Sequence, residues 1–364
     1  MKKSPFSKRF PIFHSPFSIP HSPFKSFFLL LPFYFLLLGA SDLNEQLNIR
    51  INNGTQGELR DRADMLVRFG GQSQLQGNLD KAIPYWMQAA QIYHQIGDFQ
   101  SVGRVYDFIG LAYAALGDYQ NAEEALRRRL GVARDNKDLP GQVYGLNNIG
   151  TVLLRRGSIP GARTTFEEAL AIARSINNVE GIGLSLSNLG LAAFGSRDYN
   201  QAIRLYEEAL IYRNRAGEPI GKANTLNNLG DAYRARTPHP VPRSQDFRDI
   251  IGAYGAAMRV AEAALDRPNQ YRAIDALVSL YSSTGQYIRA FELLEDRLAL
   301  DRSTENRRQE ITTLQSLAKL YLLVGKYGEA RKSYRDAIAV ARVLQDARTE
   351  AILLGEVLEI LPEP

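Results

Sequence analysis

The 364-residue sequence contains no cysteine and only four histidines. Without cysteine the chain can form no disulfide, no thiolate metal site and no thiol nucleophile. His14, His21, His94 and His239 are scattered, and none has a partner at metal-ligand spacing. No complete glycine-rich phosphate loop or nucleophile elbow is present either. We therefore expect no enzymatic activity, no bound metal and no cofactor.

Acidic residues are missing from the first 40 positions, which carry five Lys and Arg residues. The rest of the chain has 39 basic and 39 acidic residues, so the net charge of +5 belongs to this leader. A neutral remainder with both signs interspersed lacks the phosphate-neutralising surface of a nucleic-acid-binding domain. We expect no nucleic-acid partner, and we interpret the cluster Arg127, Arg128 and Arg129 as a solvated helix face.

The leader has the order of an export signal. Basic residues precede an apolar run, Phe27–Leu38, that is short for a membrane span, and the small residues 39–41 follow. We expect residues 1–40 to be a cleaved signal, with an uncleaved membrane anchor as the alternative and the only contact with a membrane. The destination is the periplasm, or the thylakoid lumen if the source is photosynthetic. Residues 41–60 form a polar linker.

A 40-residue repeat occupies most of the remaining sequence. Its clearest sign is a glycine column: Gly70, Gly110, Gly150, Gly190 and Gly230. If these glycines are given position 8, positions 4 and 7 are apolar or aromatic in all seven repeats, which predicts an amphipathic first helix. The second helix has alanine at position 20 in six repeats and a bulky residue at position 24. The bulky residues are Trp86, Leu126, Phe166, Tyr206, Tyr254, Leu294 and Tyr334.

The period predicts an all-α fold, because the helical pattern leaves no strand blocks. Seven helix pairs span residues 61–348. Eight additional residues around 237–244 separate the two helices of the fifth repeat, and three prolines there exclude a helix and favour an extended projection. Residues 349–364 supply one more helix, with Leu354 and Val357 at its fourth and seventh positions, and a short tail. We expect this lone helix to cap the last repeat.

Glycine at position 8, tyrosine at 11 and 17, alanine at 20, an aromatic at 24 and alanine at 27 resemble the tetratricopeptide repeat. The resemblance covers roughly residues 63 to 348, and the 40-residue unit is similar to the extended repeats of kinesin light chains and of bacterial regulatory and scaffold proteins. It implies a right-handed α-solenoid, a superhelix of about seven repeats. Val278 and Ala318 depart from the glycine column and Arg197 from the turn glycine, so packing is expected to loosen there.

The resemblance also implies a concave groove lined by positions 2, 5, 6, 9, 12 and 13 of each first helix, where asparagines hold peptide backbones. Asn148, Asn188 and Asn228 occupy position 6 in three successive repeats. An asparagine amide can donate to and accept from a peptide group at once. The residues expected to set side-chain preference are Tyr144, Asn147, Thr151, Arg155, Phe194, Asn224, Asn227, Asp231 and Arg234. The alternative interpretation is that these asparagines bond across adjacent helices or to water and only steady the stack.

These features predict a scaffold or assembly factor that binds a protein or peptide of unknown identity. A regulatory or sensor module that relays binding to a separate effector is the second hypothesis. An enzyme is the third, and the sequence nominates no residue for it.

Overall fold

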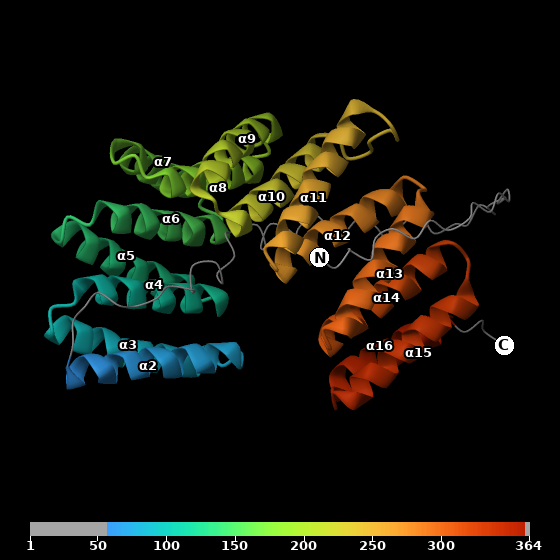
Figure 1. Cartoon of the computed structure of the whole chain (residues 1–364), viewed down its shortest axis with the longest axis horizontal. Helices are drawn as coiled ribbons and strands as arrows, with labels where there is room; N and C mark the ends of the chain where they lie inside the picture. The colour runs from blue at the N-terminus through green and yellow to red at the C-terminus, as the bar shows by residue number, and fades with distance from the viewer. Residues whose placement is uncertain (1–56, 361–364) are drawn as a thin grey trace, which may run out of the picture. The chain divides into compact units, whose positions relative to one another are not determined.

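The computed structural model describes residues 57–360, so the predicted leader and most of the predicted linker lie outside the described residues. Within this range every regular element is an α-helix, and the fifteen helices follow one another along the chain (Figure 1). The first seven are α2 (Glu58–Leu75), α3 (Leu79–Gln95), α4 (Phe99–Ala115), α5 (Tyr119–Asp135), α6 (Leu139–Arg155), α7 (Ile159–Ser175) and α8 (Val179–Gly195). The others are α9 (Tyr199–Ala216), α10 (Pro219–Arg236), α11 (Gln245–Ala263), α12 (Arg267–Ser283), α13 (Tyr287–Ser303), α14 (Arg307–Leu323), α15 (Tyr327–Val343) and α16 (Ala347–Ile360).

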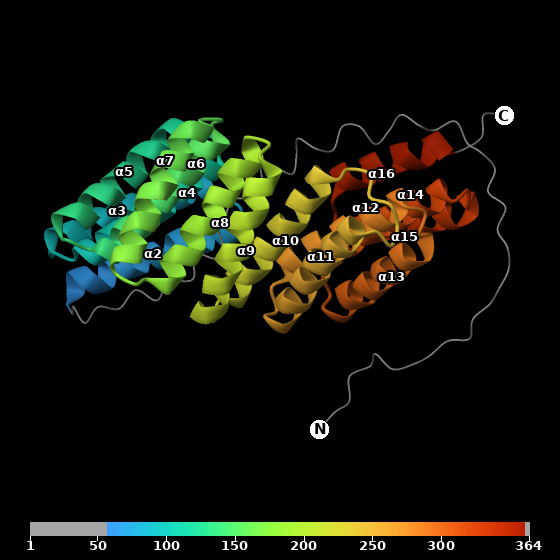
Figure 2. The same ribbon diagram turned by 90° about the horizontal axis from the view of Figure 1, so that it is seen from above.

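Consecutive helices form seven helix-turn-helix pairs (Figure 2). We call the first helix of each pair the A-helix (α2, α4, α6, α8, α10, α12 and α14) and the second the B-helix. Each A-helix packs against its own B-helix, each B-helix packs against the next A-helix, and the A-helices α4, α6, α8, α10 and α12 also contact one another in order. This neighbour-to-neighbour arrangement is that of an α-solenoid, so the predicted fold class is confirmed.

The glycine column is explained by the crossing of the two helices of a repeat. A Cβ atom added at Gly150 would lie 2.4 Å from the ring of Phe166, and one at Gly190 would lie 2.4 Å from the ring of Tyr206. Because real Cβ atoms do not approach so closely, the bulky residue at position 24 favours glycine at position 8 in these repeats. Where Val278 replaces the glycine, α12 and α13 approach each other less closely than the other pairs do.

Nearly all helices have the same length, and most of them are separated by turns of three residues, which together keep the period constant. In most turns the second residue adopts a left-handed conformation, and where glycine is absent other residues take it, such as Arg197 at φ 62°. In several turns the residue after it caps the next helix. Asp118, for example, accepts a hydrogen bond from the backbone nitrogen of Asn121. The sequence change at Arg197 therefore leaves the turn in place.

The two ends of the array expose the faces that an additional repeat would cover. Position 3 faces the preceding repeat, so Met65 in the first repeat is exposed, whereas Leu353 in α16 is buried against α15. Leu354 is 41% exposed, while Val357 packs partly against the last core cluster. In α16, Leu353 and Val357 therefore make the contact with the last repeat, and Leu354 contributes less to it.

Residues 237–244 connect α10 to α11 without a helix. Their backbone bends and turns instead of running straight: Arg243 has φ 69°, and Ser244 donates its backbone N–H to the carbonyl of Val241. Val241 is 69% exposed but Pro240 is buried. Part of this segment thus packs against the repeats and does not project from them.

Candidate functional site

The predicted asparagine ladder lies below the surface of the A-helices. Asn148 on α6, Asn188 on α8 and Asn228 on α10 are 2%, 1% and 3% exposed. They occupy the same position in three repeats because the helices have the same length and register. A buried amide is costly unless its polar atoms are hydrogen-bonded, so the bonding partners decide what these residues do.

The ladder is bonded from one A-helix to the next. Asn148 Nδ2 donates to Asp107 Oδ1 of α4 at 2.9 Å, and Asn188 Nδ2 donates to Asn147 Oδ1 of α6 at 2.9 Å. In both cases position 6 donates to position 5 of the preceding repeat. Asn147 also donates to Ser185 Oγ of α8 at 2.9 Å. These contacts are those of the alternative interpretation, in which the asparagines steady the stack, and peptide capture by them stays a prediction.

The hydrogen bond from position 6 of one repeat to position 5 of the preceding repeat has no donor between the fifth and sixth repeats. Asn227 on α10 is fully buried, and its Nδ2 donates to the backbone carbonyl of Asn269 at 3.1 Å. Its Oδ1 is buried and accepts no hydrogen bond from any residue of the described range. Position 6 of the sixth repeat, which would supply the donor, is Ala276. An unsatisfied buried acceptor costs about 1–3 kcal/mol.

We expect Ala276→Asn to raise the free energy of unfolding by about 0.5–1.5 kcal/mol, because the new amide can donate to Asn227 Oδ1. Urea denaturation followed by circular dichroism measures the change. In an Asn227→Ala background the gain should disappear. A gain of equal size there would show that the orphan oxygen is not its source.

Arg272, in the first half of α12, forms hydrogen bonds with three of the predicted site residues of α10. Its guanidinium donates to Asp231 Oδ2 at 2.5 Å, to Asn228 Oδ1 at 2.8 Å and, at the limit of hydrogen bonding, to Asn224 Oδ1 at 3.3 Å. Tyr254 donates its hydroxyl to the other oxygen of Asp231 at 2.6 Å. The sequence analysis did not select Arg272, although it occupies position 2, the same groove-lining position as Asn224. Asp231 is therefore neutralised within the array.

A second buried ion pair explains an arginine that the sequence analysis interpreted incorrectly. Arg127 and Arg128 are exposed as expected and pair with Glu123 and Glu124. The solvated-face interpretation is wrong for Arg129, whose Nε donates to Asp107 at 2.9 Å in the interior. The signal was available, because Arg129 occupies position 27, which is alanine in five repeats.

Three glycines make room for this arginine. Gly103 and Gly141 lie so close to its guanidinium that an added Cβ would approach a nitrogen to 2.7 and 2.8 Å, and Gly145 lies against the aliphatic part of its side chain. A residue larger than glycine at either of the first two positions would displace the charge from Asp107.

Five of the predicted site residues remain partly exposed, namely Tyr144, Arg155, Phe194, Asp231 and Arg234, and of these Asp231 is already paired with Arg272. They lie on α6, α8 and α10, which contact one another in that order (Figures 1 and 2). Phe194 packs against the ring of Tyr199, with centroids 5.4 Å apart. The other predicted residue of α6, Thr151, is buried and donates to the backbone carbonyl of Asn147. The structure thus separates the predicted residues into a buried, hydrogen-bonded set and an accessible set.

Acidic side chains gather near Tyr144, at the first turn of α8 and the start of α10. Burial, followed by the negative charge of Glu180, raises the pKa of the Tyr144 hydroxyl. Burial raises the pKa of Glu218 to about 7, although Arg213 opposes the shift through a hydrogen bond of 2.5 Å. Glu180 raises the pKa of Glu218 further, because a neighbouring carboxylate disfavours the charged form of Glu218.

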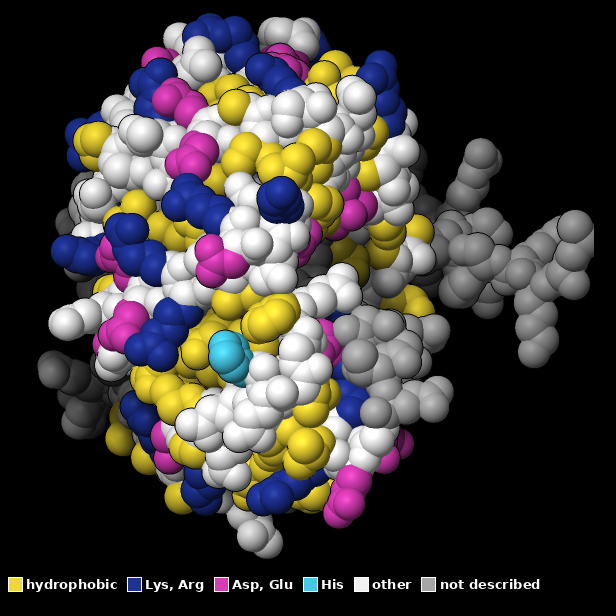
Figure 3. Space-filling model, turned by 90° about the vertical axis from the view of Figure 1, so that its left-hand side faces the viewer, with side chains coloured by type: hydrophobic (Ala, Val, Ile, Leu, Met, Phe, Trp, Pro, Cys, Tyr) yellow, Lys and Arg dark blue, Asp and Glu magenta, His cyan; other side chains and the backbone are white. Residues whose placement is uncertain are grey.

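The B-helix surface carries paired charges. On the face in Figure 3, Lys and Arg side chains are mixed with Asp and Glu side chains. Arg134 pairs with Glu168 at 2.9 Å, and 40 residues later Arg174 pairs with Glu208 at 3.0 Å, so each pair joins successive B-helices. Glu168 and Glu208 thus lie on a solvated, ion-paired face of the repeats. Exposed pairs of this kind contribute at most about 1 kcal/mol each.

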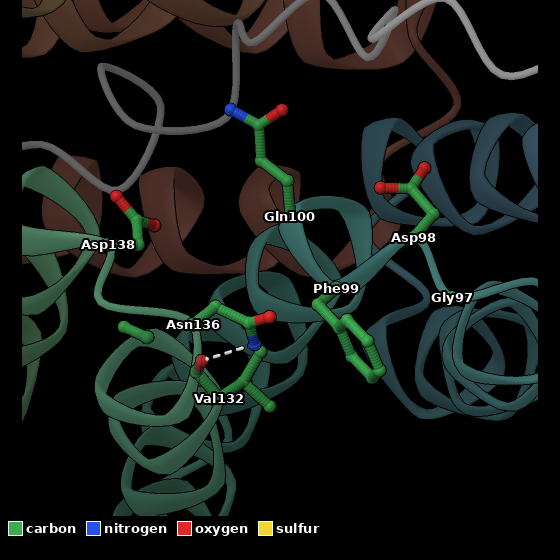
Figure 4. A pocket seen from close by; sticks show the side chains of 8 residues that line it. Gly97, Asp98, Phe99, Gln100, Val132, Asn136 and Asp138 are labelled. Carbon is green, nitrogen blue, oxygen red and sulfur yellow. Dashed lines mark hydrogen bonds between the residues drawn. The ribbon is translucent and has the colours of Figure 1, made fainter.

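One shallow cavity of about 340 Å³ lies where α4 and α6 begin, beside the C-terminal end of α5 (Figure 4). Asp98 and Asp138 line it, but both carboxylates already cap helices by accepting from the backbone nitrogens of Ser101 and Gly141. Asn136 donates to the carbonyl of Val132. Asp98, Asp138 and Asn136 are thus engaged in hydrogen bonds that hold the helix ends.

Residues 57–360 contain neither a group of candidate metal ligands nor a helix that could span a membrane. No three His, Asp or Glu side chains of this range are grouped as a metal site would need. None of the helices there combines the length and the apolar character that crossing a bilayer requires.

The family follows from a comparison with known repeats. The model of the tetratricopeptide repeat matches residues 61–135, 142–215 and 270–342, which together make up more than half of the chain. The chain belongs to the tetratricopeptide-repeat family. The unmatched stretch between the second and third regions contains α10, α11 and the eight-residue insertion, so the tetratricopeptide pattern is interrupted there in sequence although the helix pair is present.

Solved structures show the same fold. The apo form of RapI is similar over 78% of this chain and 99% of its own, at 15% identity and a TM-score of 0.51. A Rap protein complexed with competence and sporulation factor matches over 87% of this chain and 78% of its own, at 14% identity and a TM-score of 0.50.

The tetratricopeptide repeat sensor of a STAND signal-transduction ATPase from Pyrococcus horikoshii gives a TM-score of 0.54 at 17% identity. The match covers 80% of this chain and 44% of the ATPase. No curated protein matches the sequence. Identities this low show a common fold alone.

Proposed function

We propose that this tetratricopeptide-repeat chain is a non-enzymatic scaffold or assembly factor that binds a protein or peptide segment across α6, α8 and α10. One observation carries the proposal: the predicted site residues fall into two sets. The buried amides are hydrogen-bonded from helix to helix, whereas Tyr144, Phe194 and Arg234 remain accessible on three successive A-helices.

This division suits a binding surface that is formed before the ligand arrives. Direct capture by Asn148 and Asn188 would require their amides to leave Asp107 and Asn147, which would cost about 1–3 kcal/mol for each unsatisfied group. We therefore assign the asparagines to the support of the surface and the accessible side chains to contact with the ligand. Holding the A-helices in fixed register lowers the ordering cost of binding.

The fold comparison supports the proposal at the level of architecture. A Rap protein with the same fold was solved with competence and sporulation factor bound. The present chain shares that fold at 14% identity, so the chemistry of its own ligand has to come from its own residues.

A peptide library displayed on phage and selected on the purified array, residues 57–364, tests the function. We expect selected peptides to lose at least tenfold in affinity when Tyr144 and Phe194 are both replaced by alanine. Aromatic anchors of an interface commonly contribute about 1–2 kcal/mol each, and about 1.4 kcal/mol corresponds to tenfold. Fluorescence anisotropy with the synthesised peptides measures the change.

Tyr327→Ala is the matched control, because Tyr327 is an exposed aromatic residue on the B-helix α15. It should leave the affinity within twofold of the unmodified protein. Selection of no peptide, or equal losses in the control and the double variant, would contradict binding across the A-helices. Thermal melting of all variants excludes unfolding as the cause.

A further inference from the structure

The accessible part of the A-helix surface carries two positive charges that pair with no carboxylate among residues 57–360. We call the residues at positions 12 and 13 of the third to fifth repeats the terminal strip. They lie in the last turns of three A-helices and are Leu154, Arg155, Phe194, Gly195, Arg234 and Ala235. The strip contains no acidic residue, although the repeat region as a whole has equal numbers of both signs.

Arg155 is the first of the two charges. It is the last residue of α6 and is partly buried, and its Nε is enclosed without a hydrogen-bond acceptor in the described part of the chain. Burial lowers its pKa, since removal from water disfavours the charged form. The negative end of the α6 dipole favours a cation here, but it supplies no acceptor to the enclosed Nε.

Arg234 is the second charge, and its hydrogen-bond partners in the described part of the chain are neutral. Its guanidinium donates to Ser279 Oγ at 2.9 Å and to the backbone carbonyl of Ala276 at 3.4 Å. The carboxylate one turn earlier on the same helix, Asp231, already accepts from Arg272 and Tyr254.

Other enclosed arginines have a carboxylate partner, although the Nε atoms of Arg272 and Arg297 are likewise without an acceptor among the described residues. Arg129 and Arg297 pair with an aspartate of their own repeat, and Arg272 pairs with Asp231 of the preceding repeat. An uncompensated, partly desolvated guanidinium prefers a planar bidentate anion such as a carboxylate. The terminal strip is therefore complementary to acid groups supplied from outside.

The spacing of the two arginines limits what can bind both. They lie on α6 and α10, with α8 between them, and neighbouring helices pack about 8–10 Å apart, so the two positions are roughly 16–20 Å apart. An extended chain rises about 3.3 Å per residue, so this span corresponds to about five or six residues. Phe194 lies between the two charges on α8 and offers an apolar contact.

We propose that the terminal strip binds an extended acidic peptide segment, with two carboxylates five or six residues apart on Arg155 and Arg234 and an apolar side chain between them on Phe194. This inference rests on the proposed function and adds the chemistry of the ligand. Two guanidiniums on a neutral domain are too few for a nucleic-acid backbone, whose binding uses many phosphate contacts.

The test uses a fluorescein-labelled nine-residue peptide of serine and alanine, with glutamate at its second and eighth positions and leucine at its fifth. A matched peptide carries glutamine at both acidic positions. In anisotropy titrations at low salt, the glutamate peptide should bind at least tenfold more tightly than the glutamine peptide. Arg155→Gln and Arg234→Gln should each weaken the glutamate peptide at least fivefold and leave the glutamine peptide unchanged.

Arg163→Gln is the matched control, because Arg163 is an exposed arginine of the B-helix α7 that pairs with Glu167. It should change the affinity less than twofold, and melting of all variants verifies folding. Equal binding of the two peptides would overturn the inference, as would tighter binding of a twelve-residue oligothymidylate that the same arginine variants abolish. Library-selected peptides that bind without paired acidic residues would overturn the inference but leave the scaffold in place. Failure to select any peptide would count against the scaffold itself.

Discussion

Arg129→Ala will lower the free energy of unfolding by about 3–5 kcal/mol, the usual cost of removing one partner of a buried ion pair. The replacement leaves the carboxylate of Asp107 in the interior without its cation. It also empties the space between Gly103 and Gly145 that the side chain fills. Urea denaturation of the array, followed by circular dichroism, measures the loss.

The third repeat supplies the control for this prediction. It has Asn147 and Ala169 where the second repeat has Asp107 and Arg129. The double variant Asp107→Asn, Arg129→Ala reproduces that pair and removes the uncompensated charge, while Asn148 can still donate to the new amide oxygen. It should regain about 2 kcal/mol of the loss, and the remainder reflects the empty space. A double variant as unstable as Arg129→Ala alone would show that volume and not charge dominates.

Gly190→Val will lower the free energy of unfolding by about 3 kcal/mol, at the upper end of the usual range for overpacking. The added Cβ would lie 2.4 Å from the ring of Tyr206, which is itself fully buried and cannot move aside without displacing α9. Denaturation measures the loss, and hydrogen exchange should show it concentrated in α8 and α9, because contacts in a solenoid are made between neighbours.

The sixth repeat contains the compensated version of this change. There Val278 stands opposite Leu294, and the two helices are less closely packed. Adding Tyr206→Leu to Gly190→Val reproduces that pair, so the double variant should be more stable than the sum of the single losses predicts, by about 1–2 kcal/mol. If the two losses of stability are strictly additive, the ring of Tyr206 and the side chain introduced at position 190 do not compete for the same space.

The repeat architecture could be predicted because it depends on local periodicity. Glycine at position 8 and a bulky residue at position 24 are complementary within one helix pair, and both columns are visible without any knowledge of neighbouring repeats. Ala318 shows the limit of that argument. It was expected to loosen its repeat in the same way as Val278, yet α14 and α15 pack as closely as the glycine-containing pairs. Small shifts of the two helices accommodate the methyl group of Ala318, and a sequence pattern does not reveal such shifts.

The candidate site was predictable in position but only partly in its contacts. The register of Asn148, Asn188 and Asn228 on three A-helices follows from the period, and so does their shared environment. Whether an amide at that register faces a ligand or the next helix depends on the distance between A-helices. In this structure they are close enough for direct bonds such as that of Asn188 to Asn147. Arg272 was not selected and Arg129 was misinterpreted, because the sequence does not show their partners 41 and 22 residues away, although position 27 marked Arg129 as unusual.

The sequence by itself determined the class of the fold, its period and the complementarity of the two helices within each repeat, because these rest on contacts between residues about 16 positions apart. Only the tertiary structure decided which polar side chains are hydrogen-bonded within the stack and which stay accessible at its surface. Arg129 and Arg155 are both arginines of the helical repeat, but one lies opposite Asp107 and the other opposite no carboxylate of the described chain. That difference arises from the packing of neighbouring helices, because they determine which side chains lie next to an enclosed charge.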